Sequence, residues 1–326
     1  MTQIYGTFGP SCKSRGVLKD MFLAGMTGMR LNLSHCNLDD VEEQISAFHA
    51  AAAETGRQAQ LVIDTQGPEL RLGGLSAPLE LKSGSAIAFG EKIPVPEVVL
   101  NALETGDEVL LDDGKIALEI IDAASYQAKV VRGGCLHSHK SVKITGKQIP
   151  LPVLTNRDLY NIRYAKKYGV TGLLQPFVHN GTELRELRAL LEENGAGELK
   201  IFAKIETMDG AEHLEDILPY ADVIVIARGD LGNDMPLWQL PAVQKEISAA
   251  CREAGKPFIV VTQMLASMEH AAVPTRAEVS DIFNAVADGA WGVMLTGETA
   301  IGEYPVEAIR YLTNTAAEAE CWKTNR

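Results

Sequence analysis

The sequence predicts an α/β protein, a (β/α)8 TIM-type barrel with an inserted small β-barrel lid domain. Short apolar runs alternate with amphipathic helical segments up to residue 72 and again after about residue 152, the pattern of parallel strands joined by helices. These runs number eight, as a closed β/α barrel requires. Between 73 and 147 the helical periodicity is lost, and Gly, Pro, Val and Ile are frequent.

The predicted elements follow in order along the chain. The expected strands are the apolar runs 3–7, 29–33, 61–64, 172–175, 199–204, 223–227, 257–261 and 291–295. Helices are expected at 14–24, from 37, from 155, at 182–193 and 236–254, from 274 and at 305–320. Gly25 ends the first helix and Asn37 caps the second. Thr155 with Asp158 and Thr275 with Glu278 match the capping-box pattern.

The middle segment reads as β structure. Val109–Gly114 followed by Ile116–Ile120 resembles a hairpin across an Asp-Gly turn. Because it follows the third barrel strand, the insertion should lie over the functional face, as a lid. The expected domains are a catalytic barrel over 1–72 and 148–326 and a β lid over 73–147.

Composition restricts the class of protein. A net charge of −13 and a pI of about 5.1, with no Lys/Arg cluster, argue against a nucleic-acid partner. The five scattered cysteines lack any CxxC spacing and indicate free thiols in a reducing compartment. There is no leader pattern at the N-terminus and no apolar run long enough for a membrane span. These features predict a soluble, cytoplasmic protein.

Charged and polar residues follow the ends of most predicted strands. In a β/α barrel the functional residues lie at these carboxyl ends. The two most informative ends are Lys204-Ile-Glu206 and Arg228-Gly-Asp230, each directly after a mostly apolar run. Together they offer one ammonium group and two carboxylates, which suit a phosphate beside a hard divalent cation. Solvated loop charges are the alternative interpretation.

Several motifs resemble the pyruvate kinase family, over nearly the whole chain. The matching stretches are Thr7–Pro10, Arg30–His35, Asp64–Arg71, Ala203–Glu206, Ala227–Gly232, Thr262–Met268, Pro274–Glu278 and Met294–Ala300. The resemblance implies a (β/α)8 barrel with a β lid, and glycolytic phosphoryl transfer from phosphoenolpyruvate to ADP, giving pyruvate and ATP. It implies Mg2+ or Mn2+ and K+ as cofactors.

The resemblance also assigns roles to individual residues. Lys204, Arg30 and Thr296 are the expected catalytic residues, with Thr296 in a proton-delivery position where the family usually has Ser. Glu206 and Asp230 are the expected Mg2+ or Mn2+ ligands. The substrate carboxylate is expected at the backbone N–H groups of Ala227, Arg228, Gly229 and Asp230 and at the Thr262 hydroxyl.

The remaining expected sites bind K+ and the nucleotide. Asn32, Ser34, Asp64 and the Thr65 carbonyl match the family's K+ site, and Glu69 is the residue type that accompanies K+ dependence. Arg30, Asn32, His35 and Lys140 are the expected nucleotide-binding residues. Three alternatives stay open: an Arg30–Asp64 structural ion pair, a surface role for His35, and a merely solvated Lys140.

The sequence also departs from the family. Gln66 replaces a lysine, Pro176 replaces a serine close to Lys204, and residues 36–40 replace the family's nucleotide segment. The chain is expected to lack the family's C-terminal allosteric domain, and it could assemble as a homo-oligomer through barrel surfaces. The rival functions are a lyase or aldolase of the phosphoenolpyruvate/pyruvate barrel enzymes and a non-enzymatic phosphoenolpyruvate sensor.

Overall fold

The computed structural model describes residues 1–325 except 35, 68, 69, 91, 113, 148 and 150. The chain divides into two compact units, which are described separately. One unit combines Met1–Gly67 with Val153–Arg326, and the other is Pro68–Pro152. The inserted unit therefore begins after residue 67 and ends at residue 152, whereas the sequence predicts 73 and 147.

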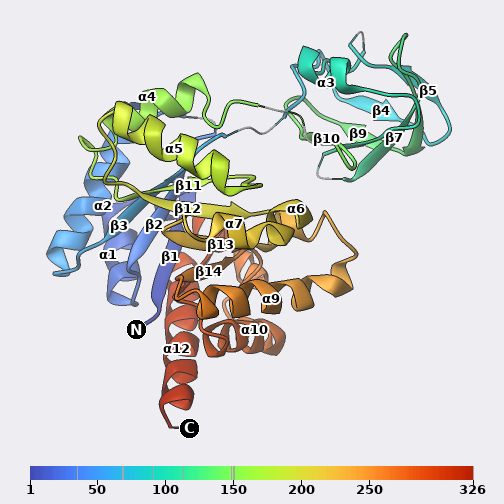
Figure 1. Cartoon of the computed structure of the whole chain (residues 1–326). Helices are drawn as coiled ribbons and strands as arrows, with labels where there is room; N and C mark the ends of the chain where they lie inside the picture. The colour runs from blue at the N-terminus through green and yellow to red at the C-terminus, as the bar shows by residue number, and fades with distance from the viewer. Residues whose placement is uncertain are drawn as a thin grey trace. The chain divides into compact units, whose positions relative to one another are not determined.

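The first unit contains the predicted closed barrel (Figure 1). Its eight strands are β1 (Gln3–Thr7), β2 (Gly28–Asn32), β3 (Gln60–Asp64), β11 (Gly172–Gln175), β12 (Lys200–Ile205), β13 (Val223–Ala227), β14 (Phe258–Val261) and β15 (Gly292–Met294). All neighbours are parallel, and the ring closes because Tyr5 of β1 pairs with both Gly28 of β2 and Met294 of β15. This confirms the predicted α/β barrel.

Large side chains fill the barrel interior. Tyr5 and Phe202 are fully buried there and meet edge to face, with ring centroids 6.4 Å apart. Their bulk requires glycine on the neighbouring strands. A Cβ at Gly28 would lie 2.4 Å from the Tyr5 ring, and one at Gly172 would lie 2.6 Å from the Phe202 ring. The interior is therefore a packed core rather than a channel, so the open strand ends are left for a site.

Helices cover the outside of the ring. They are α1 (Arg15–Leu23), α2 (Glu42–Glu54), α4 (Asn156–Tyr164), α5 (Gly181–Glu193), α6 (Met208–Glu212), α7 (Leu214–Ile217), α8 (Arg228–Leu231), α9 (Leu240–Glu253), α10 (Arg276–Ala287), α11 (Gly297–Ala300) and α12 (Pro305–Thr324). The short 3-10 helices among the described residues are η1 (Pro10–Cys12), η2 (Asp39–Val41), η3 (Leu237–Gln239) and η4 (Ala266–Glu269).

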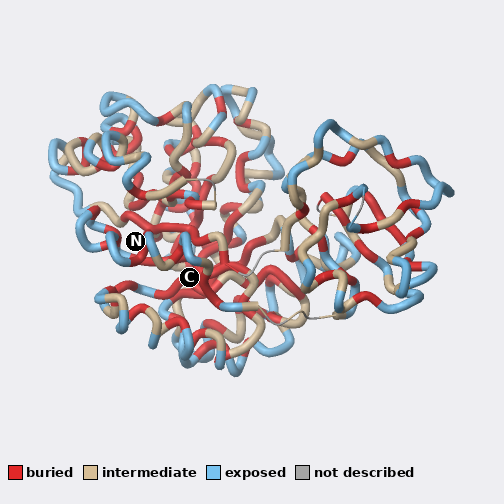
Figure 2. The backbone as a smooth tube through the Cα atoms, turned by 90° about the horizontal axis from the view of Figure 1, so that it is seen from above, coloured by how far each residue is buried: buried red, intermediate tan, exposed pale blue. Residues whose placement is uncertain are grey.

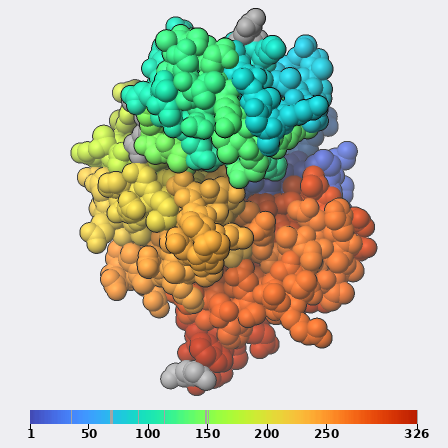
Figure 3. All heavy atoms as spheres, turned by 90° about the vertical axis from the view of Figure 1, so that its right-hand side faces the viewer, coloured from blue at the N-terminus to red at the C-terminus, as the bar shows by residue number. Residues whose placement is uncertain are grey.

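The helices bury one face and expose the other. Apolar side chains such as Phe22, Phe48, Leu187 and Leu312 form a continuous layer between helices and strands, and the strands are buried along almost their whole length (Figure 2). The opposite helix faces form the outer surface of this unit, which Figure 3 shows for the yellow and orange segments. In the described part of the chain, no helix has the length and hydropathy to span a membrane.

The helix boundaries mostly follow the sequence signals. Both predicted capping boxes are present, at Thr155 with Asp158 and at Thr275 with Glu278, and Gly25 ends α1 with a φ of 117°. The prediction that Asn37 caps α2 is wrong. The backbone N–H of Asn37 instead donates to Asp40, and the short helix η2 precedes α2.

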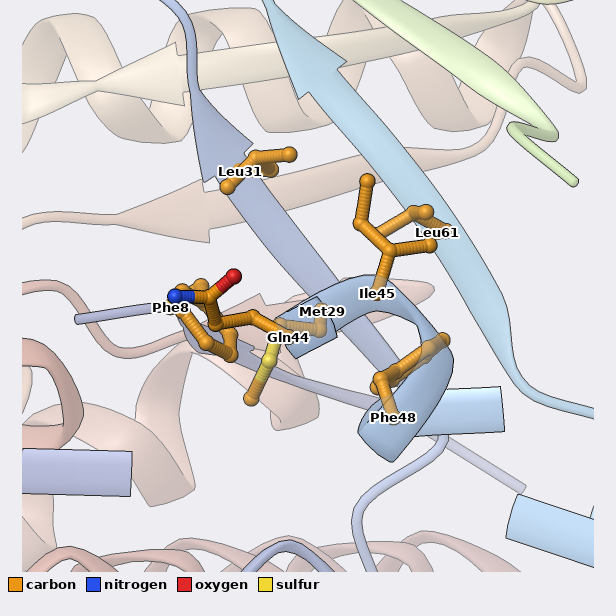
Figure 4. A pocket seen from close by; sticks show the side chains of 7 residues that line it. All are labelled: Phe8, Met29, Leu31, Gln44, Ile45, Phe48 and Leu61. Atoms are coloured by element: carbon orange, nitrogen blue, oxygen red, sulfur yellow. The ribbon is translucent and has the colours of Figure 1, made fainter. Parts of the chain in front are cut away.

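A small apolar recess lies between α2 and strands β2 and β3 (Figure 4). It is lined by Phe8, Met29, Leu31, Gln44, Ile45, Phe48 and Leu61. These side chains belong to the layer between helices and strands. Gln44 is the one polar residue among the described residues that line it, so the recess is best explained as part of the packing.

The inserted unit is a small antiparallel β domain. Its elements are β4 (Leu79–Leu81), β5 (Ala86–Ala88), α3 (Glu97–Ala102), β6 (Glu108–Leu111), β7 (Ile116–Asp122), β8 (Gln127–Arg132), β9 (Gly134–Leu136) and β10 (Val142–Ile144). The predicted hairpin is present, because β6 and β7 pair antiparallel. Among the described residues the strands form a five-stranded and a two-stranded sheet rather than one closed ring. Val109, Leu118 and Val130 belong to a core separate from that of the barrel.

Glu278 gives the barrel unit a measurable pH dependence of stability. Burial alone would raise the pKa of Glu278, but hydrogen bonds from Ser267 and Thr275 outweigh it and hold the pKa below its usual value. A depressed pKa contributes stability above the unfolded-state pKa of about 4.3 and loses it as the pH falls through the folded-state value. We expect Glu278→Gln to lower the free energy of unfolding by about 1–2 kcal/mol at pH 7.

The difference between wild type and Glu278→Gln should begin to narrow as the pH falls below the unfolded-state pKa of about 4.3, because the unfolded wild-type chain then binds a proton that the folded carboxylate still resists. Urea unfolding followed by circular dichroism at pH 7 and pH 3.5 measures this. A difference that stays constant between the two pH values would show that the carboxylate charge contributes nothing.

Candidate active site

The strongest cluster of buried charge lies at the carboxyl ends of the barrel strands, around Lys204. Its ammonium nitrogen, Nζ, lies 3.0 Å from Glu206 Oε1 and 3.5 Å from Asp64 Oδ1, and only 15% of its side chain is exposed. Burial alone would lower the pKa of Lys204, but the two carboxylates outweigh this effect and raise it. A full positive charge is therefore held at the mouth of the barrel.

Arg30 of β2 binds the same aspartate from the other side. Its Nη2 lies 2.6 Å from Asp64 Oδ2, its Nε donates to that oxygen at 2.7 Å, and Nη1 donates to Thr7 at 3.4 Å. Burial would raise the pKa of Asp64, but Lys204 and Arg30 together hold it below its usual value. The structural ion pair left open by the sequence is thus formed, and it orients the guanidinium at this rim.

Glu206 and Asp230 follow the adjacent strands β12 and β13. Glu206 is 2% exposed, and its Oε2 accepts the backbone N–H of Phe177 at 2.9 Å. Burial raises the pKa of Glu206, and the charge of Asp230 adds to that effect while Lys204 opposes it. Two carboxylates that disfavour each other's charge fit a hard divalent cation. No third His, Cys, Asp or Glu joins them in the described part of the chain, so further ligands would come from bound molecules or the backbone.

A strained turn holds Glu206 in place. Phe177 has a φ of 49°, in the left-handed region that bulky residues rarely adopt, and this turn aims its N–H at Glu206. Pro176, just before it, packs against Gly67, where a Cβ would lie 2.4 Å from the proline ring. Although Pro176 replaces the family's serine, Lys204 keeps contacts to both of its carboxylates.

The residues expected at the substrate carboxylate lie on neighbouring strand ends. Ala227 of β13 and Val261 of β14 are partners in the sheet, so α8 and Thr262 follow them side by side. A Cβ on Gly229 would lie 3.1 Å from Thr262 Cγ2, so the two segments are in close contact. The Arg228 side chain, however, points to the Thr262 carbonyl rather than to open space.

Thr296 lies at the end of the last strand. Its backbone N–H and its hydroxyl donate to Glu298 Oε2 at 2.7 and 3.3 Å, and Glu298 Oε1 accepts the N–H of Leu265 at 3.0 Å. Glu298 is 1% exposed. This buried carboxylate therefore ties Thr296 to the loop that follows Thr262.

The expected K+ residues supply oxygen atoms at the ends of β2 and β3. Asn32 and Asp64 are partners in the parallel ladder. Asn32 Oδ1 accepts hydrogen bonds from the Ser34 N–H at 3.0 Å and hydroxyl at 2.7 Å, while the Thr65 hydroxyl donates to Leu174. This all-oxygen set has the chemistry that a hard monovalent cation prefers.

The expected nucleotide residues come from different parts of the chain. Arg30 and Asn32 lie on β2, whereas His35 falls outside the described residues, as does Glu69. Lys140 belongs to the inserted unit, where its Nζ lies 2.8 Å from Asp112 Oδ1. Lys140 is thus paired rather than simply solvated.

Two carboxylates that the sequence does not mark as site residues organise the site: Asp158 and Asp281. The capping pattern explains only part of the role of Asp158, which also accepts the backbone N–H groups of Gln66 and Gly67. These contacts come from tertiary structure. Glu298, by contrast, is among the polar residues that the sequence places at the end of the last strand, without assigning it a role.

The fold and the site define a (β/α)8-barrel protein with a buried charge cluster at the carboxyl ends of its strands. A family model described as the barrel domain of pyruvate kinase matches residues 1–309. Curated pyruvate kinases from Geobacillus stearothermophilus and Bacillus licheniformis are 38% and 36% identical to this chain over 334 and 333 residues. Each alignment covers 98% of this chain and 57% of the relative, so the chain spans little more than half their length. The chain belongs to the pyruvate kinase family.

Proposed function

We propose that the chain transfers the phosphoryl group of phosphoenolpyruvate to ADP, giving pyruvate and ATP, with Mg2+ or Mn2+ and K+ as cofactors. The observation that carries this proposal is the Lys204 cluster, where one ammonium and two carboxylates meet at the barrel mouth. The curated relatives from Geobacillus stearothermophilus and Bacillus licheniformis, both named pyruvate kinase, support the same activity.

Each residue would contribute by position and charge. Lys204 would stabilise the negative charge of the phosphoryl group in flight, an electrostatic task that requires little covalent chemistry. Arg30, oriented by Asp64, would direct its planar guanidinium to the same phosphate. Because Asp64 holds one side of this guanidinium, the Arg30 side chain would already be oriented for the phosphate before the substrate binds.

The cations would supply the remaining positive charge. Glu206 and Asp230 would hold the divalent ion, which when bound neutralises charge on the phosphoryl and enolate oxygens. The K+ ligands would be Asn32, Ser34, Asp64 and Thr65. In this proposal the ions balance the buried carboxylates of Glu206 and Asp64 together with the exposed carboxylate of Asp230.

The other groups would handle the three-carbon part of the substrate. The backbone N–H groups at Ala227–Asp230 and the Thr262 hydroxyl would bind its carboxylate. Thr296 would relay a proton from solvent to the enolpyruvate carbon, its hydroxyl releasing one proton as it takes up another. In the structure this hydroxyl donates to Glu298 Oε2 at 3.3 Å. Lys140 and His35 are proposed to contact the nucleotide.

One assay tests the activity directly. Purified protein is supplied with phosphoenolpyruvate, ADP, Mg2+ and K+, and pyruvate is followed against a Lys204→Ala control. We expect turnover that EDTA abolishes and that falls when Na+ replaces K+. Pyruvate no higher than in the control would refute the kinase proposal. Phosphoenolpyruvate binding without any use of ADP would favour the lyase or sensor instead.

A further inference from the structure

We infer that Arg228 and Asp281 form a clamp that positions Thr262 for the proposed substrate, a role that rests on the proposed function. The clamp consists of the Arg228 guanidinium, the Thr262 carbonyl and the Asp281 carboxylate. Arg228 is therefore a positioning residue: its side chain contacts the protein backbone, and Thr262 is the residue proposed to contact the substrate.

The backbone after β14 needs such a support. Thr262 has a φ of 80° and Gln263 a φ of 56°, two consecutive residues in the left-handed region. This conformation is rare for any residue with a side chain, and it is a genuine outlier for a β-branched residue such as threonine. Strain of this kind persists only where surrounding contacts enforce it.

Arg228 supplies those contacts. Its Nε and Nη2 donate to the Thr262 carbonyl oxygen at 3.1 and 2.7 Å, and its Nη1 lies 2.7 Å from Asp281 Oδ2. Only 12% of the arginine side chain is exposed, against 34% for the aspartate. Asp281 lies on α10, outside the ring. The helix layer therefore fixes the Arg228 side chain through Asp281, and Arg228 in turn fixes the backbone turn at Thr262.

The clamp also sets the direction of the Thr262 side chain. Val261 and Ala227 are partners in the parallel ladder, so Thr262 and α8 leave the sheet together. With its carbonyl turned to Arg228, Thr262 places its methyl and hydroxyl against Gly229, where a Cβ would lie 3.1 and 3.6 Å from them. The hydroxyl is thus presented at the segment proposed to bind the substrate carboxylate.

The decisive variant is Arg228→Lys. A lysine keeps one positive charge but cannot donate two hydrogen bonds to Thr262 while contacting Asp281. We expect the KM for phosphoenolpyruvate to rise by about tenfold, because a hydrogen bond to a charged group is lost, with a smaller change in kcat. Asp281→Asn, at a partly exposed position, should give the same trend at a few-fold and guards against a variant that fails to fold.

A matched arginine elsewhere in the barrel provides the control. Arg188 donates to the carbonyl oxygens of Gly197 and Leu199 and pairs with Asp222 at 2.7 Å, before the amino end of β12. Arg188→Lys should lower Tm by a similar amount and leave the KM for phosphoenolpyruvate unchanged. The comparison separates general destabilisation from loss of the clamp.

A rescue and a measurement without substrate complete the test. Asn favours the left-handed conformation, so the exposed Gln263→Asn change should restore much of the KM in the Arg228→Lys background. Hydrogen exchange of the amides at 262–265 should be faster in Arg228→Lys and unchanged in Arg188→Lys. Unchanged exchange together with an unchanged KM in both clamp variants would overturn the inference. A wild-type protein that makes no pyruvate would count against the proposed function alone, because hydrogen exchange still decides on the clamp.

Discussion

Lys204→Ala is expected to lower kcat for pyruvate formation by about 10²–10³-fold or more, the usual effect of removing one preorganised charge from a catalytic site. The ammonium is the positive group that contacts both Glu206 and Asp64. Arg30 pairs with Asp64, whereas Glu206 has its ion pair with Lys204. Steady-state kinetics with a coupled pyruvate assay measure the loss.

Stability has to be separated from catalysis in this test. Removing one partner of a buried ion pair costs about 3–5 kcal/mol when the other charge is left unpaired, although Asp64 keeps Arg30 as a partner. Lys204→Arg retains a charge beside both carboxylates, so it should melt close to the wild type and still lose most of its rate. Lys200→Ala, at the exposed amino end of the same strand, should leave both properties unchanged. A Lys204→Ala enzyme within threefold of the wild-type rate would exclude the proposed role.

The sequence was most informative where chemistry follows directly from topology. Parallel strands bring their carboxyl ends to one rim, so Lys204, Glu206 and Asp64 could be predicted to meet before any contact was known. The contacts confirm that these three side chains cluster. What each would bind came from the resemblance to a family, and those assignments stay predictions.

The supporting contacts could not be predicted, because they join residues that no local pattern connects. Asp281 lies 53 residues from Arg228, on a helix whose only sequence signal was its cap. The left-handed backbone at Thr262 and Phe177 could not be predicted either, because neither threonine nor phenylalanine favours a positive φ. Tertiary packing enforces these conformations.

The prediction for the start of α2 was wrong for a different reason. Asn37 is a good capping residue by type, but its side-chain oxygen accepts a hydrogen bond from the Asn161 amide on α4 at 3.5 Å. The N–H of Leu38 also donates to the Asn161 side-chain oxygen. A tertiary hydrogen bond therefore overrode the local propensity.

Asp158→Asn is expected to lower the free energy of unfolding by about 2–4 kcal/mol, the range for breaking a buried hydrogen-bond network. The carboxylate is 1% exposed and accepts four hydrogen bonds. Two come from the Thr155 N–H and hydroxyl at 2.9 and 2.7 Å, and two from the N–H groups of Gln66 and Gly67 at 2.8 and 3.1 Å. An amide would replace one of the carboxylate oxygens by an NH2 group, which cannot accept a hydrogen bond. The N–H or O–H groups that face it would then lose their acceptor.

The same change should also weaken the binding of K+ at its proposed site. Asp158 fixes the backbone directly after Asp64 and Thr65, so the K+ concentration for half-maximal activity should rise in Asp158→Asn. The matched control is Asn180→Ala, which removes a helix cap: the hydrogen bond that Asn180 accepts from the Glu183 N–H at 3.1 Å and the one it donates to Glu183 Oε1 at 3.3 Å. This control should cost about 1 kcal/mol and leave the K+ response unchanged. Urea denaturation measures the free energy of unfolding, and a K+ titration of pyruvate formation measures the K+ concentration for half-maximal activity. If Asp158→Asn destabilises the protein no more than Asn180→Ala does, Asp158 is merely a cap and the loop after β3 is held by other contacts.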